Sequence, residues 1–520
     1  MKNKAAKREK LTWFARFLNV VETAGNRLPH PITMFAILAV AIVLISGLCA
    51  ALGVSATGEM IDAKTMEVSE QTITVVSLMN REGLAYMLTH AVSNFTGFAP
   101  LGVVLVTMLG VGCAEGSGYL SALMKKAVSV TPAVIVTPML VFLGVMSNVA
   151  SDIGYVVLIP IGAVVFMAYG RHPLAGLAAA FAGVSGGFSA NLLIGTLDPM
   201  LAGLSTEAAR MVDPAYVVQP TANWYFMIVS TVVIVVIGTF VTDRIVEPRL
   251  SAHSHTGEDV ETATALSAQE KKALRLANLT LFAFIVAVAA LALPQNSFLR
   301  NAETGSLMNN SPFMDGLIIL IAVLFFLPSV VYGRVSGNYK DEKDVCNQLG
   351  VNMSAMGSYI ALAFVAAQFI SYFNYTKLGS VLALKGASFL EQAGVGGPVL
   401  MICFILFSAL INLVMGSASA KWTILAPVFV PMFMLLGYSP ELTQVAYRIG
   451  DSCTNLITPL MTYFAMIVVF AKKYDKDSGI GTLISTMLPY SLFFMIGWSV
   501  LLVAWMMLGL PLGPGAAMAL

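Results

Sequence analysis

Charged residues are scarce in this sequence of 520 residues. Asp, Glu, Lys and Arg together make up 11% of the chain, whereas about 25% is usual in soluble domains. Positive charge is not in surplus either, because the formal net charge is only +1. The first shortage argues against a soluble protein, and the second gives no indication of a nucleic-acid partner.

Metal-binding and disulfide patterns are also missing. The five cysteines lie far apart, no C-x-x-C pair occurs, and the five histidines form no cluster. Such spacing predicts neither a disulfide framework nor a zinc site. We therefore expect no metal centre and no bound cofactor.

Long apolar segments are what the chain has in abundance. Hydrophobic residues make up 58% of it, and the mean hydropathy is +0.82. A helix needs about 20 apolar residues to cross the roughly 30 Å hydrocarbon core of a bilayer. Seven uninterrupted runs approach or exceed this length: 32–54, 97–114, 223–242, 274–293, 313–332, 353–373 and 483–507.

The first run follows the basic segment MKNKAAKREK, which resembles the start of a signal peptide. The run is too long for a signal-peptide core and has no clear small-x-small cleavage site. We interpret it as a transmembrane helix with a cytoplasmic N-terminus, preceded by an interfacial amphipathic stretch at Trp13–Val21. Lysine and arginine are concentrated in the connections that this topology places inside, and it leaves the C-terminus outside.

Four further apolar segments contain polar or helix-breaking residues. Segments 173–204 and 440–470 are interrupted by Gly, Ser, Asn and Thr, and we interpret them as broken helices. Segments 131–169 and 398–436 have small polar residues at their centres, and we interpret them as re-entrant hairpins. The predicted fold is therefore an all-α polytopic membrane protein with about nine transmembrane helices and two re-entrant hairpins.

An internal repeat relates the two halves of the chain. A shift of 267 residues, without gaps, aligns helix breakers in both copies. The aligned pairs include Pro160 with Pro427, Gly170 with Gly437, Pro173 with Pro440, and Gly183 with Gly450. Five crossings separate equivalent points, so the copies must be inverted, as is typical of secondary transporters with a site near the midplane. The alternative is that two apolar hairpins resemble each other by chance.

These features divide the chain into five parts. They are an N-terminal tail with the first helix and an external loop (1–83), a first repeat (84–250), a cytoplasmic linker with two connecting helices (251–346), a second repeat (347–510) and a C-terminal tail (511–520).

Polar residues occur where a bilayer is most apolar. The first hairpin turns at 147–152, which includes Asn148 and Asp152, and the second turns at 416–421, which includes Ser419. Tight turns leave backbone N–H and C=O groups free to bind an anion or a cation. The alternative role of the small residues is close helix packing.

Arg448 and Asp451 lie three residues apart, on one face of the second broken helix. The repeat aligns them with Phe181 and Val184, so the two charges belong to one copy only. Arg448 is suited to hold a substrate carboxylate, and Asp451 to hold a coupling ion or to accept a hydrogen bond from a donor on the solute. The alternative is a mutual ion pair. Trp422 can either stack on an aromatic solute or pack in the core.

Two further patterns bear on function. Asp198, in the second half of the first broken helix, is another candidate site residue, with a loop or helix-terminal role as the alternative. Residues 183–187 fit the G-x-S-x-G motif of serine hydrolases, but that motif needs a nearby histidine base. The repeat accounts better for these glycines as helix breakers, so we predict that the protein is not an enzyme.

Several short sequence motifs, spread along nearly the whole chain, resemble those of a known family. They are LPHP at 28–31, NFTGFAPLG at 94–102, GRHPLAG at 170–176, AGVSGG at 182–187, IVEP at 245–248, GSASA at 416–420 and LGPG at 512–515. The chain resembles the AbgT family of p-aminobenzoyl-glutamate transporters, and within it the MtrF-like branch.

The resemblance implies a homodimer in which each subunit has nine helices and two hairpins. It also implies a solute site and a cation position. The solute site consists of Ser419, Trp422, Pro440, Arg448 and Asp451, with Asp198 from the other repeat. The cation position is at Asn412 with Asp451, and Asn148 and Asn455 at the breaks are further cation candidates. Lys421 departs from the uncharged residue expected there, and its charge either strengthens anion binding or extends to the membrane surface.

The sequence therefore predicts a secondary active transporter in the inner membrane of a bacterium, coupled to a sodium or proton gradient. The resemblance implies aromatic carboxylates of the p-aminobenzoyl-glutamate or p-aminobenzoate type as solutes, or sulfonamide antimetabolites that are exported. The alternative function is an ion-translocating subunit of a membrane enzyme complex, of the decarboxylase sodium pump type.

Overall fold

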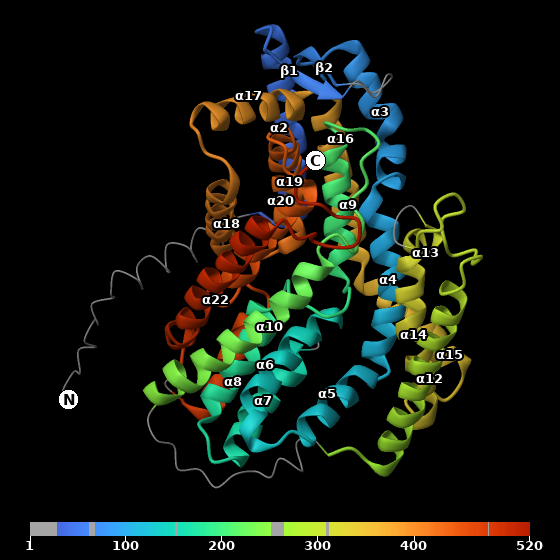
Figure 1. Ribbon diagram of the computed structural model, residues 1–520, viewed down its shortest axis with the longest axis vertical. Helices are drawn as coiled ribbons and strands as arrows, with labels where there is room; N and C mark the ends of the chain where they lie inside the picture. The colour runs from blue at the N-terminus through green and yellow to red at the C-terminus, as the bar shows by residue number, and fades with distance from the viewer. Residues whose placement is uncertain (1–28, 62–67, 151–153, 251–264, 308–310, 477) are drawn as a thin grey trace, which may run out of the picture.

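The computed structural model describes residues 29–61, 68–150, 154–250, 265–307, 311–476 and 478–520 (Figure 1). Some predictions fall outside this part of the chain. They concern the cytoplasmic N-terminal tail with its stretch Trp13–Val21, the tip residue Asp152, and most of the linker at 251–272.

The first half of the described chain is helical apart from one β-hairpin. Its elements are α2 (Pro31–Ala51), β1 (Ser55–Ile61), β2 (Val68–Thr74), α3 (Arg81–Thr96), α4 (Ala99–Gly116), α5 (Tyr119–Ser129), α6 (Val136–Ser147), α7 (Ile159–Ala168), α8 (Pro173–Phe181), α9 (Leu197–Ala209) and α10 (Trp224–Val241). Pro31 and Pro173 begin α2 and α8, where the N–H that proline lacks would have no helical partner.

In the second half of the described chain, all the named elements are helices. Its elements are α12 (Ala268–Ala292), α13 (Pro312–Asp315), α14 (Leu317–Ser336), α15 (Glu342–Ala355), α16 (Gly357–Tyr375), α17 (Leu378–Gln392), α18 (Gly397–Val414), α19 (Ala418–Met434), α20 (Pro440–Thr454), α21 (Phe464–Tyr474) and α22 (Ile480–Leu508). Ser439 caps α20 by accepting a 3.2 Å hydrogen bond from the Leu442 N–H, which fixes where that helix begins.

Seven of the described helices are long and apolar enough to cross a membrane, and the number rises to nine if two bent helix pairs each form one span. The bent pairs are α5 with Ala133–Ser147, at 118°, and α15 with α16, at 42°. Large apolar side chains such as Leu48, Leu279 and Val500 lie exposed on α2, α12 and α22, as expected for lipid-facing surfaces. The prediction of a mostly all-α polytopic membrane protein is confirmed.

The β-hairpin is not predicted from hydropathy, and it lies within the segment expected to be an external loop. β1 and β2 pair antiparallel, and the Thr57 and Thr72 hydroxyl oxygens are 2.8 Å apart across the strands. Helix α17 lies at the same end of the molecule and places Leu384 against Gly58 (Figure 1). Short elements of this kind have no apolar run long enough to reveal them.

Two helical hairpins and two interrupted helices surround the centre of the molecule. α6 and α7 form the first hairpin, in which α7 follows a π-helical turn at Gly154–Leu158. α18 and α19 form the second hairpin, with a non-helical break at 415–417. α8 continues into a π-helical turn and is separated from α9 by 187–196, and α20 is separated from α21 by 455–463.

The interrupted helices of the two halves begin at positions separated by the same offset as the sequence repeat. α8 and α20 begin at Pro173 and Pro440, and α9 and α21 begin at Leu197 and Phe464, so each pair of helix starts is 267 residues apart. The breaks between the half-helices therefore occupy equivalent positions in the two halves of the chain.

The same contacts join hairpin and interrupted helix in each half. In both, a glycine of the interrupted helix packs on a carbonyl of the hairpin arm, and an asparagine near the end of that arm donates to a carbonyl of the helix. A Cβ built on Gly183 would lie 2.3 Å from Val141 O, and one built on Gly450 would lie 2.4 Å from Ile405 O. The hydrogen bonds run from Asn148 Nδ2 to Val184 O (3.0 Å) and from Asn412 Nδ2 to Asp451 O (2.6 Å). The two halves are thus packed in the same manner.

Candidate functional site

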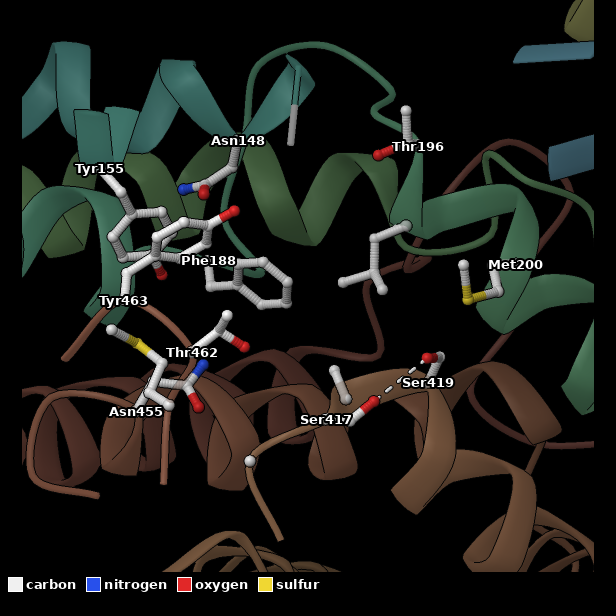
Figure 2. A pocket seen from close by; sticks show the side chains of 14 residues that line it. Asn148, Tyr155, Phe188, Thr196, Met200, Ser417, Ser419, Asn455, Thr462 and Tyr463 are labelled. Atoms are coloured by element: carbon white, nitrogen blue, oxygen red, sulfur yellow. Dashed lines mark hydrogen bonds between the residues drawn. The ribbon is translucent and has the colours of Figure 1, made fainter. Parts of the chain in front are cut away.

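A cavity of about 400 Å³ lies where the two hairpin ends and the two helix breaks meet (Figure 2). Its size is within the range of roughly 300–1,000 Å³ that is usual for small-molecule sites. The lining residues are Asn148, Tyr155, Phe188, Thr196, Leu197, Met200, Gly416, Ser417, Ala418, Ser419, Asn455, Met461, Thr462 and Tyr463. Both halves of the chain contribute to it.

One side of the cavity is aromatic. The rings of Tyr155 and Tyr463 stack with their centroids 4.7 Å apart and their planes at 16°, and Phe188 lies beside them (Figure 2). Tyr155 comes from the turn that begins the second arm of the first hairpin, and Tyr463 comes from the break before α21. Aromatic faces arranged in this way offer a surface on which a planar ring can stack.

The N-terminus of α19 forms another side. Ser417 is the N-cap residue, and its Oγ accepts a 3.4 Å hydrogen bond from the Ala420 N–H. The N–H groups of Ala418 and Ser419 belong to the first turn, where no intrahelical acceptor exists. These groups and the positive end of the helix dipole favour an anion at this wall.

Asn148 supplies a polar atom at the end of α6. Its Nδ2 donates to Val184 O at 3.0 Å and Val145 O at 3.2 Å, which holds the buried side chain in place. Its Oδ1 accepts no hydrogen bond from any residue that the structure describes. A buried amide oxygen without a partner is costly, so it is available to a donor on a ligand.

The predicted cation residues divide between the cavity and its surroundings. Asn148 and Asn455 line the cavity, whereas Asn412 and Asp451 are not among its lining residues. The Asn412 Nδ2 donates to Asp451 O at 2.6 Å, to Thr454 Oγ1 at 2.9 Å and to Asn455 Oδ1 at 2.8 Å. Asn412 therefore ties α18 to the end of α20, next to the cavity.

Lys421 pairs with Asp451, and it does not extend to the membrane surface. The Lys421 side chain is fully buried, and its Nζ donates to Asp451 Oδ1 and to Asn412 Oδ1. A buried carboxylate needs a counter-charge, and Lys421 supplies it from the neighbouring helix.

Arg448 pairs with Asp198, which lies 250 residues away in the sequence. Its Nη2 donates to Asp198 Oδ1, while Asp198 Oδ2 accepts the Gly195 N–H at 2.7 Å. Asp198 follows Leu197 directly, so this ion pair lies just behind the lining of the cavity. Arg448 and Asp451 therefore do not form the mutual ion pair that was the alternative.

Trp422 and Pro440 lie outside the lining of the cavity, whereas Ser419 is part of it. Trp422 is completely buried, stacks on Tyr447 with centroids 4.5 Å apart, and donates from Nε1 to Ser205 Oγ at 3.0 Å. Pro440 is the first residue of α20, eleven residues before Asp451 and thus about 16 Å along the helix.

Several cavity residues were not predicted from the sequence, namely Tyr155 as a wall residue, Tyr463, Phe188, Thr196 and Thr462. The 267-residue offset contains a signal for them, because it aligns Thr196 with Tyr463 and Phe188 with Asn455. Both pairs lie in the helix breaks, where backbone and side chains turn away from regular packing. No cluster of three or more His, Cys, Asp and Glu residues suited to a metal occurs within the described residues.

Comparison with known proteins places this architecture in one family. The model of the AbgT putative transporter family matches residues 16–520. The p-aminobenzoyl-glutamate transport protein of Escherichia coli (strain K12) is 38% identical over 495 residues, which is 95% of each chain.

Two solved structures are also similar. The Neisseria gonorrhoeae MtrF structure, reported as illuminating a class of antimetabolite efflux pumps, has a TM-score of 0.90 and 50% identity, and the match covers 96% of this chain and all of that one. The YdaH transporter of Alcanivorax borkumensis has a TM-score of 0.85 and 46% identity, covering 94% of this chain and all of that one. With its nearly full-length match to the family model and to these relatives, the chain belongs to the AbgT family of membrane transporters.

Proposed function

We propose that this transporter carries aromatic carboxylates of the p-aminobenzoyl-glutamate or p-aminobenzoate type across the bacterial inner membrane. The relative from E. coli is a p-aminobenzoyl-glutamate transport protein, and the MtrF structure is reported for a class of antimetabolite efflux pumps. Export of sulfonamide antimetabolites, which share the p-aminobenzene ring, belongs to the same proposal.

The main support for this proposal is that two sides of the cavity differ in chemistry, one being aromatic and the other suited to an anion. The stacked rings of Tyr155 and Tyr463 line one side, and the N-terminus of α19 at Ala418 and Ser419 lines another. An aromatic carboxylate has one group for each: its ring suits the tyrosine side, and its carboxylate suits the helix N-terminus. The unpartnered Oδ1 of Asn148 is suited to an N–H donor such as an aromatic amine.

In this proposal, Arg448 supplies a positive charge behind the lining of the cavity. Its guanidinium must leave Asp198 before it can hold a substrate carboxylate in its bidentate fork. In the described conformation, the N-terminus of α19 is therefore the better placed anion-binding group. Trp422 of α19 stacks on Tyr447 of α20, and this contact joins the two helices.

The repeated packing of the two halves supports an alternating-access mechanism. Equivalent helix starts are 267 residues apart, and equivalent contacts join each hairpin to its interrupted helix. We propose that the halves are inverted repeats in a homodimer, with the N-terminus cytoplasmic and the C-terminus external. Movement of the hairpins around the cavity, driven by a sodium or proton gradient, would expose the cavity to each side in turn.

The test is solute flux in vesicles that contain the purified protein. Labelled p-aminobenzoate and p-aminobenzoyl-glutamate are offered under a sodium gradient alone and under a proton gradient alone. Saturable flux of either solute above protein-free vesicles is expected under one of the gradients. Ion flux without flux of either solute would refute the proposal and favour an ion-translocating subunit.

A further inference from the structure

Three elements converge on the Lys421 ammonium group. Lys421 lies in the first turn of α19 and is only 1% exposed, and its Nζ donates to Asn412 Oδ1 of α18 and to Asp451 Oδ1 of α20. These two acceptors are the residues at which the family resemblance implies a bound cation. A covalently attached cation of this chain thus occupies the position where a free ion is expected.

The oxygen atoms around this position do not fit a sodium ion while Lys421 is there. A hard cation needs several oxygen ligands at once. The Oδ1 atoms of Asn412 and Asp451 both accept from Nζ, and the main-chain oxygen of Asp451 accepts from the Asn412 amide group. Asp451 Oδ2 is the remaining carboxylate oxygen, and it has no partner among the described residues. Of the side-chain oxygens of Asn412 and Asp451, this one alone has no partner among the described residues, which is too few for a hard cation.

Charge balance leads to the same result. The Asp451 carboxylate is neutralised by Lys421, and the carboxylate of the buried Asp198 is neutralised by Arg448. A sodium ion added to this centre would bring a second positive charge to a carboxylate that is already paired. An uncompensated charge of this kind is costly in a buried environment.

We infer that the Lys421 ammonium is a built-in cation that takes the place of sodium at Asn412 and Asp451 and closes this position to the ion. Lys421 thus determines ion specificity in this chain. As a statement about coupling, the inference rests on the proposed transport function, whereas the binding measurements that test it need no solute. A failure of solute flux would therefore leave its test intact.

The experiment compares sodium with choline at equal ionic strength on the purified full-length protein. The melting temperature Tm is measured as the NaCl concentration rises for the wild type, Lys421→Ala, and the double variant Lys421→Ala/Asp451→Asn. Lys385→Ala, which removes an exposed lysine of α17, is the matched control. A ligand that binds the folded state raises Tm with the logarithm of its concentration above Kd.

The wild type and Lys385→Ala are expected to show no difference between sodium and choline. Lys421→Ala is expected to gain a sodium-dependent rise in Tm, because the emptied position exposes both Oδ1 atoms, and the double variant is expected to lose that rise. A sodium-dependent rise in the wild type that Asp451→Asn abolishes would overturn the inference. So would a folded Lys421→Ala protein with no response to sodium.

Radioactive sodium binding to the wild type and to the double variant Lys421→Ala/Asp451→Asn, in which neither charge is left unpaired, decides the question if Lys421→Ala does not fold. Equal background binding to both proteins is the expected result. Saturable binding to the wild type that the double variant lacks would show that sodium shares the position with Lys421, against the inference.

Discussion

At the scale of single residues, two buried ion pairs join different elements of this protein. Arg448 and Asp451 lie three residues apart on the same helix, but they do not pair with each other. Arg448 forms an ion pair with Asp198 of α9, and Asp451 forms one with Lys421 of α19. Each ion pair thus joins α20 to a neighbouring element that contributes to the cavity. Removing one member of a buried ion pair leaves an uncompensated charge, which is far more costly than removing both.

Asp198→Asn tests the first of these ion pairs. The change leaves Arg448 buried without its counter-charge, and we expect a loss of about 3–5 kcal/mol in the free energy of unfolding. Heating in detergent followed by size-exclusion chromatography measures the resulting fall in Tm. The control is Asp315→Asn, at an exposed acid of α13, which should leave Tm unchanged.

The double variant Asp198→Asn/Arg448→Gln separates loss of the ion pair from loss of shape. Because neither charge remains, it should regain a large part of the stability that Asp198→Asn loses. A double variant less stable than either single variant would contradict the assigned ion pair.

Trp422 offers a second prediction at this scale. Because Trp422 is completely buried against Tyr447 and bonded to Ser205, Trp422→Ala should destabilise the protein by about 3–5 kcal/mol. Trp422→Phe should lose less, and Phe389→Ala, at an exposed aromatic of α17, should lose almost nothing. Thermal unfolding of the three variants ranks them. A Trp422→Ala protein as stable as the wild type would instead favour a role for Trp422 in solute contact.

At the scale of elements, close glycine contacts determine how each interrupted helix packs on its hairpin. Gly183 and Gly450 approach carbonyl oxygens of α6 and α18 so closely that neither has room for a Cβ. The backbones can therefore touch, as small residues allow in membrane helices. The breaks that follow these contacts place polar groups and aromatic rings around the cavity.

Gly450→Ala and Gly183→Ala should each lower Tm, because the added methyl group would meet backbone atoms that cannot move aside. The matched control is Gly481→Ala in α22, where a Cβ would meet nothing within 4 Å. That change should preserve or slightly raise Tm, since alanine is a better helix former than glycine and nothing obstructs its methyl group. Equal Tm values in all three variants would contradict the close packing.

Much of this arrangement could be predicted from the sequence, because apolar length and helix breakers are local properties. Hydropathy predicts the long helices, and Gly and Pro indicate where helices begin or are interrupted, as Pro173 and Pro440 do for the starts of α8 and α20. The choice of charge partners could not be predicted. Arg448 reaches Asp198 across 250 residues of sequence, and no local pattern separates that contact from the closer Asp451. The β-hairpin at 55–74 is likewise too short to leave a hydropathy signal.

At the scale of the whole molecule, an apolar exterior surrounds a polar, aromatic centre. The outer faces of α2, α12 and α22 expose large apolar side chains, whereas the cavity at the centre is lined from both halves of the chain. Helices α12, α14 and α15 form a column to one side, with α14 and α15 packed on α4, away from the hairpins (Figure 1). The solute site that we propose is thus a property of the paired halves, and neither half contains it alone.

The most direct test of this account is the affinity of the purified protein for p-aminobenzoyl-glutamate in the wild type, Tyr463→Leu and Tyr225→Leu. Tyr463 belongs to the stacked pair in the cavity, whereas Tyr225 lies on α10, outside the cavity lining. The account predicts that Tyr463→Leu raises Kd about tenfold, which corresponds to a loss of about 1.4 kcal/mol, while Tyr225→Leu leaves Kd unchanged. Equal affinity in all three folded proteins would contradict the claim that this cavity binds the solute.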